Sequence, residues 1–237
     1  MGADGAWAAV MRRRISLRRK RPRALRGALA AALGLVALAA LPSYSPAIAA
    51  EMRILALGDS LTAGLGLPEG QGFAAQLERA LNAGGRAVRV LNAGVSGDTT
   101  AGGLQRLDWA LAGKPHVAIV ELGANDMLRG LDPAKAEANL DAILTKLKKR
   151  GVTTLLAGML AAPNLGRDYE RAFNAIYPAL AQKHGVALYP FFLDGVAGNL
   201  ALLLPDGLHP NERGVAEIVR RILPAVERAL AEAAKAG

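Results

Sequence analysis

The chain has 237 residues and a formal net charge of +9, and its length is typical of one α/β domain with a leader. It contains no cysteine, which excludes disulfide bonds, thiolate catalysis, cysteine-ligated zinc and an acylated lipoprotein cysteine. Hydrophobic residues make up 52% of the chain and aromatic residues only 4%, so the core must be aliphatic, as in a buried parallel sheet.

The positive charge belongs to the beginning of the chain. Residues 1–49 contain nine of the 29 basic residues and one of the 20 acidic residues, so the remainder is nearly neutral. A nearly neutral body offers no broad basic surface, and we therefore expect no nucleic-acid partner.

The first 49 residues have the three parts of a secretory signal peptide. The basic residues are followed by fifteen uncharged residues at 27–41, and Ala47-Ile48-Ala49 offers a cleavage site. The alternative is a membrane anchor, but the uncharged run is shorter than the roughly 20 residues that a spanning helix needs. We predict a signal peptide at 1–49 and a folded domain at 50–237, exported to the periplasm or secreted, without a stable anchor after cleavage. Met11 directly precedes the arginines, and we hypothesise that it is the true start.

After Met52, short apolar runs alternate with amphipathic stretches. Strands are predicted at 53–57, 88–91, 117–122, 153–159 and 186–189, and helices at 73–82, 100–111, 133–150, 169–184 and 212–234. This alternation predicts the α/β class, with a three-layer α/β/α sandwich around a five-stranded parallel sheet. Ligands of such sheets bind beyond the carboxyl ends of the strands, so functional residues should follow strands.

The first motif, Gly58-Asp59-Ser60-Leu61, follows the first predicted strand. A serine at this place points into the crevice at the end of the sheet, and Gly58 allows the backbone to turn sharply. The alternative is a helix cap, because Asp and Ser both cap helices well. The motif is not the G-x-S-x-G elbow of α/β-hydrolases, because Thr62 stands where the second glycine would be.

Loops after the second and third strands carry Ser96-Gly97-Asp98-Thr99 and Gly123-Ala124-Asn125-Asp126. A tetrahedral intermediate needs fixed hydrogen-bond donors for its oxyanion. Asn125 offers a side-chain amide, and Gly97 lets a backbone N–H approach closely. The alternative is turn chemistry, with Asp98 or Thr99 capping the next helix.

Asp206-Gly207-Leu208-His209-Pro210 precedes the last helix. A histidine base needs a carboxylate on its far ring nitrogen, and a three-residue step can supply it. The alternative is an ordinary loop turn. His116 leads into a strand, and His184 ends a helix, where a cation is favourable, so His209 is the candidate base.

In this order the motifs resemble the four blocks of the SGNH (GDSL-type) hydrolases, and most of all the bacterial periplasmic acyl-CoA thioesterase, lysophospholipase and arylesterase branch. The resemblance runs from Ile54 to about Val226. It implies the flavodoxin-like SGNH hydrolase fold, no metal or organic cofactor, and Ser60 as nucleophile. It also implies that Asp206 and His209 complete the triad. The implied oxyanion hole consists of the Ser60 backbone N–H with Gly97 and Asn125.

The resulting prediction is a serine esterase that hydrolyses small-molecule acyl esters, thioesters or lysophospholipids through an acyl-enzyme, acting as a monomer. We expect the stretch 160–168 to border the acyl pocket. Its Ala161, Ala162 and Leu165 suit an apolar chain, and they suit ordinary loop packing equally well. Two alternatives remain: a non-catalytic sugar- or lipid-binding protein, and a metal-dependent hydrolase. The metal ligands of the second alternative would be Asp59, Asp126, Asp206 and His209.

Overall fold

The computed structural model describes residues 51–236, so the predicted leader, Met11 and the domain boundary lie outside the described residues. Its centre is a parallel sheet with the strand order β2-β1-β3-β4-β5. The strands are β1 (Met52–Gly58), β2 (Val88–Gly94), β3 (Val117–Glu121), β4 (Thr153–Ala157) and β5 (Ala187–Tyr189). Strand β1 thus lies between β2 and β3, which brings the loops after these three strands together.

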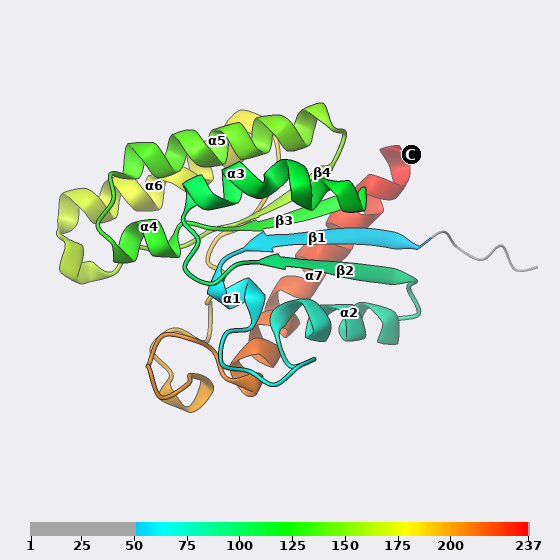
Figure 1. Ribbon diagram of the computed structural model, residues 1–237, viewed down its shortest axis with the longest axis horizontal. Helices are drawn as coiled ribbons and strands as arrows, with labels where there is room; N and C mark the ends of the chain where they lie inside the picture. Colours follow the sequence, from blue (N-terminus) through cyan, green and yellow to red (C-terminus); the bar gives the residue numbers. More distant parts are fainter. Residues whose placement is uncertain (1–50, 237) are drawn as a thin grey trace, which may run out of the picture. The chain divides into compact units, whose positions relative to one another are not determined.

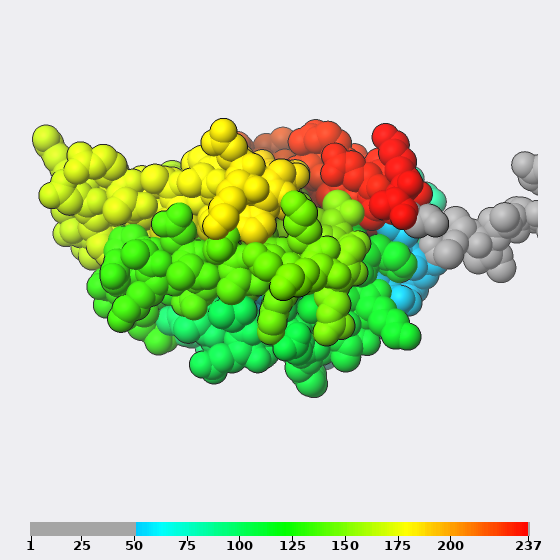
Figure 2. All heavy atoms as spheres, turned by 90° about the horizontal axis from the view of Figure 1, so that it is seen from above, coloured from blue at the N-terminus to red at the C-terminus, as the bar shows by residue number. Residues whose placement is uncertain are grey.

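Helices cover both faces of the sheet (Figure 1). One face carries α3 (Thr100–Ala110), α5 (Pro133–Lys149) and α6 (Arg167–His184), and the other carries α2 (Phe73–Ala83) and α7 (Glu212–Ala236). In the space-filling view the green atoms of α3 and α5 and the yellow atoms of α6 form a continuous surface over their face (Figure 2). The predicted three-layer α/β/α sandwich is confirmed. No helix within 51–236 is long and apolar enough to cross a membrane.

The core is aliphatic, as the composition predicts. All five residues of β3 are buried, as expected for a central strand covered on both faces. Helix α5 shows how the flanking layer is attached. Its residues Leu140, Ile143, Leu144 and Leu147 are at most 1% exposed, and their spacing places them on one face. The Asp132 carboxylate caps the same helix by accepting from Ala134 N at 3.0 Å, with Pro133 in the first turn.

The five strands and five long helices agree with the sequence predictions, with differences of up to three residues at their ends. Strand β3 ends one residue before the predicted 117–122, β4 ends two residues before 153–159, and β2 extends three residues beyond 88–91. Two short helices are not predicted, namely α1 (Ser60–Ala63) and α4 (Ala124–Leu128). They are four and five residues long, which is too short to be stable alone or to show a hydrophobic period.

The sheet register aligns the predicted functional segments. Gly58, the last residue of β1, is paired with Gly94 of β2 on one side and with Glu121 of β3 on the other. The three loops that carry Ser60, Gly97 and Asn125 therefore leave the sheet at one level, beyond the carboxyl ends of the strands.

Candidate active site

Ser60 lies in the first turn of α1, directly beyond the end of β1. The capping alternative is correct for its neighbour, because Asp59 Oδ1 accepts from Leu61 N at 3.0 Å and so caps α1. Ser60 itself is left free to project from the helix. Its Oγ lies 2.8 Å from His209 Nε2 across 149 residues of sequence. The structure therefore brings the candidate nucleophile and the candidate base into hydrogen-bond contact.

The turn that carries His209 also supplies its carboxylate. Asp206 Oδ2 lies 2.7 Å from His209 Nδ1, while Oδ1 accepts from Leu208 N at 2.9 Å and from His209 N at 3.0 Å. The backbone N–H groups of His209 and Leu208 are the main reason that the pKa of Asp206 falls to about 2. Gly207 has a φ of +70°, which favours glycine here. This is a loop turn, as the alternative held, and its geometry places an ionised carboxylate on the far nitrogen of His209.

The loop after β2 contains a tight turn with Gly97 at its third position. Asp98 N donates to Val95 O at 3.0 Å, and the φ of Gly97 is +82°, as in a type II turn. Within residues 51–236, neither the Gly97 N–H nor the Ser60 N–H has a hydrogen-bond partner. These two backbone donors are therefore available to a ligand.

Nearby Gly94 is glycine for another reason. A Cβ on Gly94 would meet the backbone N of Ala63 at 2.2 Å. Close packing against α1 thus explains Gly94, whereas the turn conformation explains Gly97.

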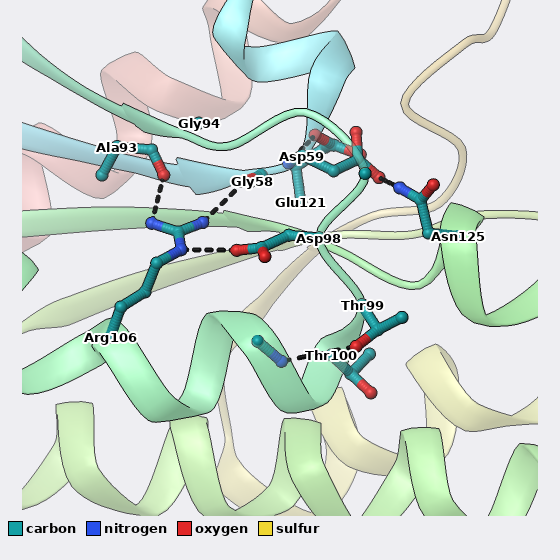
Figure 3. A network of polar contacts seen from close by, with 12 residues as sticks. Gly58, Asp59, Ala93, Gly94, Asp98, Thr99, Thr100, Arg106, Glu121 and Asn125 are labelled. Carbon is teal, nitrogen blue, oxygen red and sulfur yellow. Dashed lines mark hydrogen bonds and ion pairs between the residues drawn. The ribbon is translucent and has the colours of Figure 1, made fainter.

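Asn125 is held by a buried carboxylate. Its Nδ2 donates to Asp59 Oδ2 at 3.0 Å (Figure 3), and its side chain lines the cavity beside Ser60. The amide has a second proton, which this contact leaves free. Asp59 is completely buried and links the helix of the serine, through Leu61 N, to this amide.

A second acid lies beneath Asp59. Glu121 Oε2 accepts from Thr62 Oγ1 at 2.8 Å and from Asp59 N at 3.4 Å. Burial raises the pKa of Asp59 to about 6 and raises that of Glu121 well above its ordinary value, with the charge of Asp59 acting in the same direction on Glu121. Because two neighbouring buried carboxyls avoid a double charge, the geometry favours a protonated Glu121 beneath an ionised Asp59 at neutral pH.

An arginine that sequence reasoning missed joins the ends of the first two strands. Arg106 of α3 donates to Asp98 Oδ2 at 2.5 Å, to Ala93 O at 2.6 Å and to Gly58 O at 2.8 Å (Figure 3). A single arginine in an amphipathic helix gives no signal that separates it from a solvated surface charge. The only available sign is its position, about two helical turns after the Ser96–Thr99 motif.

A cavity of about 310 Å³ opens beside Ser60 and His209. Asn125 completes its polar end, and the rest of the lining is apolar: Leu61, Ala124, Met127, Leu128, Met159, Leu160, Ala161, Ala162, Phe191, Leu193, Ala197 and Leu208. The prediction that residues 160–168 border the pocket is correct for Ala161 and Ala162, which line the cavity. Leu165 instead packs against the hydrophobic core and does not line the cavity.

The other two histidines have separate partners. His116 Nδ1 accepts from Arg53 N at 2.9 Å, next to the start of β3, and His184 Nε2 lies 2.6 Å from Asp141 Oδ1 at the end of α6. Over residues 51–236, no group of three or more His, Asp or Glu side chains is placed to hold a metal ion. The four ligands of the metal alternative are therefore not gathered into one set. Asp126, for example, accepts from Thr100 N and Oγ1 at 2.8 and 2.7 Å.

Comparison with known proteins shows the family to which the chain belongs. A model of the GDSL-like lipase/acylhydrolase family matches residues 56–216. The chain belongs to this family. The predicted relationship to the SGNH (GDSL-type) hydrolases is thereby confirmed, together with the prediction that the chain is an ester-hydrolysing enzyme.

Relatives of the chain cover most of it. The esterase TesA of Pseudomonas aeruginosa is 41% identical over 180 residues, which are 76% of this chain and 90% of that protein. The thioesterase 1/protease 1/lysophospholipase L1 of Escherichia coli is 40% identical over 164 residues, 69% of this chain and 77% of that protein. Among solved structures, the SGNH-hydrolase family esterase AlinE4 is 52% identical, with a TM-score of 0.65 over 76% of this chain and 97% of AlinE4.

Proposed function

We propose that this protein hydrolyses small-molecule acyl esters and thioesters, with Ser60 as nucleophile, His209 as general base and Asp206 as the carboxylate that orients it. The observation that supports this assignment is the continuous path from Ser60 Oγ to His209 at 2.8 Å and on to Asp206 at 2.7 Å, beside an apolar cavity. This is the arrangement of nucleophile, base and orienting group that acyl transfer requires.

In the proposed reaction, Ser60 Oγ attacks the carbonyl carbon while its proton passes to His209 Nε2. The carbonyl oxygen becomes an oxyanion, which accepts from the N–H groups of Ser60 and Gly97 and from the Asn125 amide. His209 then gives the proton to the leaving alcohol or thiol, and an acyl-serine remains. Water, deprotonated by His209, attacks the acyl-serine and releases the acid. Asp206 stays ionised throughout, because backbone N–H groups hold its pKa at about 2.

The cavity supports a substrate with an apolar acyl group. Within residues 51–236, no aspartate, glutamate, lysine or arginine side chain lines it. Its volume of about 310 Å³ is at the lower end for ligand cavities, so we propose a short or medium acyl chain. The names of the relatives, esterase and thioesterase 1/lysophospholipase L1, support both oxygen and sulfur leaving groups.

The site of action that we propose is the periplasm or the exterior of the cell. The support is the sequence of residues 1–49, with its basic stretch followed by fifteen uncharged residues. Mass spectrometry of the protein recovered from a producing cell tests this directly. A mature chain that begins near residue 50 is the expected result, and a cytoplasmic chain that retains 12–49 would contradict it.

Replacing the nucleophile tests the reaction itself. Ser60→Ala should fold with an unchanged melting temperature and lose nearly all hydrolysis of p-nitrophenyl butyrate. Ser96 is the other serine of the described residues and is exposed, so Ser96→Ala is the matched control and should keep its activity. A serine-directed phosphonate should label the peptide containing Ser60, and activity should persist in EDTA. Full hydrolysis by the Ser60 variant, or labelling at Ser96 alone, would refute the assignment.

A further inference from the structure

We infer that Arg106, paired with Asp98, is a positioning residue for the oxyanion hole, because it fixes the two segments that carry Ser60 and Gly97 relative to each other. This inference rests on the proposed function. We call Arg106, Asp98 and the carbonyl oxygens of Gly58 and Ala93 the Arg106 clamp (Figure 3).

The clamp uses each nitrogen of one guanidinium for a different segment of chain. Nη2 donates to Gly58 O, two residues before Ser60, and Nη1 donates to Ala93 O near the end of β2. Nε donates to the Asp98 carboxylate, one residue after Gly97. The planar guanidinium spans all three acceptors at once, which the point charge of a lysine ammonium cannot do.

The ion pair of Arg106 and Asp98 lies where it stabilises the structure more than an exposed ion pair would. The Arg106 and Asp98 side chains are each 18% exposed, so solvent screens the pair less than it screens the fully exposed pairs. Two backbone carbonyls satisfy the remaining nitrogens. Removing the guanidinium would leave a largely buried Asp98 carboxylate without its partner, so Asp98 would have to turn toward water.

Such a movement would act directly on the proposed oxyanion donor. Asp98 N closes the Val95–Asp98 turn by donating to Val95 O, and Val95 N donates to Gly58 O at 3.1 Å. Gly58 O therefore accepts from the turn and from Arg106 together. The Gly97 N–H is held inside this closed set of contacts, and a displacement of about 1 Å in a catalytic group is enough to reduce a rate by about 10²-fold.

Gly102 gives independent support, because helix α3 makes room for the clamp. A Cβ on Gly102 would lie 2.5 Å from Asp98 Oδ1. Gly102 lies in the first turn of α3, and the neighbouring Gly103 makes room for Leu122 in the same way. At Gly102, the Asp98 carboxylate occupies the space that a side chain would fill.

Kinetics of clamp variants test the inference. Arg106→Lys keeps the charge but cannot reach three acceptors, so kcat for p-nitrophenyl butyrate should fall roughly 10–10²-fold, within the effect of losing one oxyanion donor. KM should change less than threefold, because ground-state binding uses the apolar cavity. Inactivation by the phosphonate, which places an oxygen in the oxyanion hole, should slow by the same factor as kcat. Asp98→Ala should reproduce these effects, and Asp98→Asn, which retains an acceptor for Arg106, should recover part of the rate.

Two further variants separate positioning from folding. Gly102→Ala displaces the Asp98 carboxylate without removing either charge, so kcat should fall, while the melting temperature should fall less than in Asp98→Ala. Arg79→Lys is the matched control, because Arg79 of α2 also donates from a helix to a loop carbonyl, at 2.6 Å to Gly70 O, away from the site. Its kcat should equal that of the wild type.

Retention of kcat within twofold in folded Arg106→Lys or Gly102→Ala would overturn the inference, as would a loss confined to the melting temperature. If Arg106→Lys does not fold, Gly102→Ala and Asp98→Asn decide the matter. Failure of the proposed function is distinguishable, because the wild type itself would then not be labelled at Ser60. Normal labelling in every clamp variant would leave that function standing and refute only the role of Arg106.

Discussion

The two halves of the site are held in different ways. On the nucleophile side, Asp59 is completely buried and Arg106 is 18% exposed, and their contacts join segments far apart in the sequence. On the base side, Asp206 is 44% exposed and its partners lie within three residues. The comparison teaches that the proposed oxyanion donors are positioned by contacts across the whole fold, whereas the proposed base is oriented by one local turn.

The largest expected effect comes from Asp206→Asn, which tests the local half. Because Leu208 N and His209 N both donate to Oδ1, the asparagine oxygen should occupy that place. Its NH₂ group then faces His209 Nδ1 and forces the wrong tautomer on the imidazole. We expect kcat to fall on the order of 10⁴-fold, with little change in melting temperature because the turn keeps its backbone bonds. A loss of less than tenfold would show that Asp206 does not orient His209.

The next effect belongs to the long-range half. Asn125→Ala removes one proposed oxyanion donor, and kcat should fall roughly 10²–10³-fold with little change in KM. Asn139→Ala is a suitable control, since Asn139 Nδ2 donates to Thr100 Oγ1 and its side chain does not line the cavity. Steady-state kinetics on p-nitrophenyl butyrate measure both. A rise in KM with unchanged kcat for Asn125→Ala would assign the amide to ground-state binding instead.

The smallest of these effects on kcat is expected for Asp59→Asn. At neutral pH the same substitution should raise the stability of the protein. One oxygen of the new side chain cannot accept from both Leu61 N and Asn125 Nδ2, so the amide of Asn125 loses its anchor. We expect kcat to fall roughly 10–10²-fold, less than or equal to the loss caused by deleting the donor.

The pH dependence of stability sharpens this prediction. Burial raises the pKa of Asp59 from 3.8 to about 6, so the folded protein binds more protons than the unfolded chain between these values. The contribution of Asp59 to the free energy of unfolding therefore decreases as the pH rises from about 4 to above 6. The Asp59→Asn variant does not lose stability in this way. The difference between its melting temperature and that of the wild type should therefore increase from pH 4 to pH 7. Thermal melts at pH 4 and pH 7 measure the difference, and a relative melting temperature that falls with pH would contradict it.

The fold could be predicted because the sequence patterns that indicate its strands and helices extend over many residues. The apolar run 117–122 and the spaced leucines of α5 report burial over many residues, and the alternation of strands and helices fixes a parallel sheet. Helices α1 and α4 could not be predicted, because single turns depend on tertiary contacts such as the Asp59 cap. The ends of β3 and β4 also depend on where the neighbouring strands stop pairing. The sequence of a single strand does not contain this information.

The site was predictable to the extent that its chemistry lies in compact motifs. Ser60 and Asn125 each follow a predicted strand, and the Asp206–His209 pair precedes the last predicted helix. The structure places Ser60, His209 and Asp206 in contact. The motif predicts Asp98 or Thr99 as the cap of the next helix, and the cap is Thr99, which accepts from Gly102 N at 3.4 Å. The partnership of Asp98 with Arg106 depends on how α3 lies against the strand ends, and a single sequence contains no record of that geometry.

The sequence separation of 149 residues between Ser60 and His209 also sets the order in which the site is completed during synthesis. A ribosome makes Ser60, the two loops of the proposed oxyanion hole and the Arg106 clamp before it reaches the turn at 206–209. An unfinished chain therefore carries the residues of the proposed oxyanion hole, but it has no imidazole to take the serine proton. Ester hydrolysis requires His209 in the turn at 206–209. Chains that end before this turn should therefore have no esterase activity in the compartment where they are made.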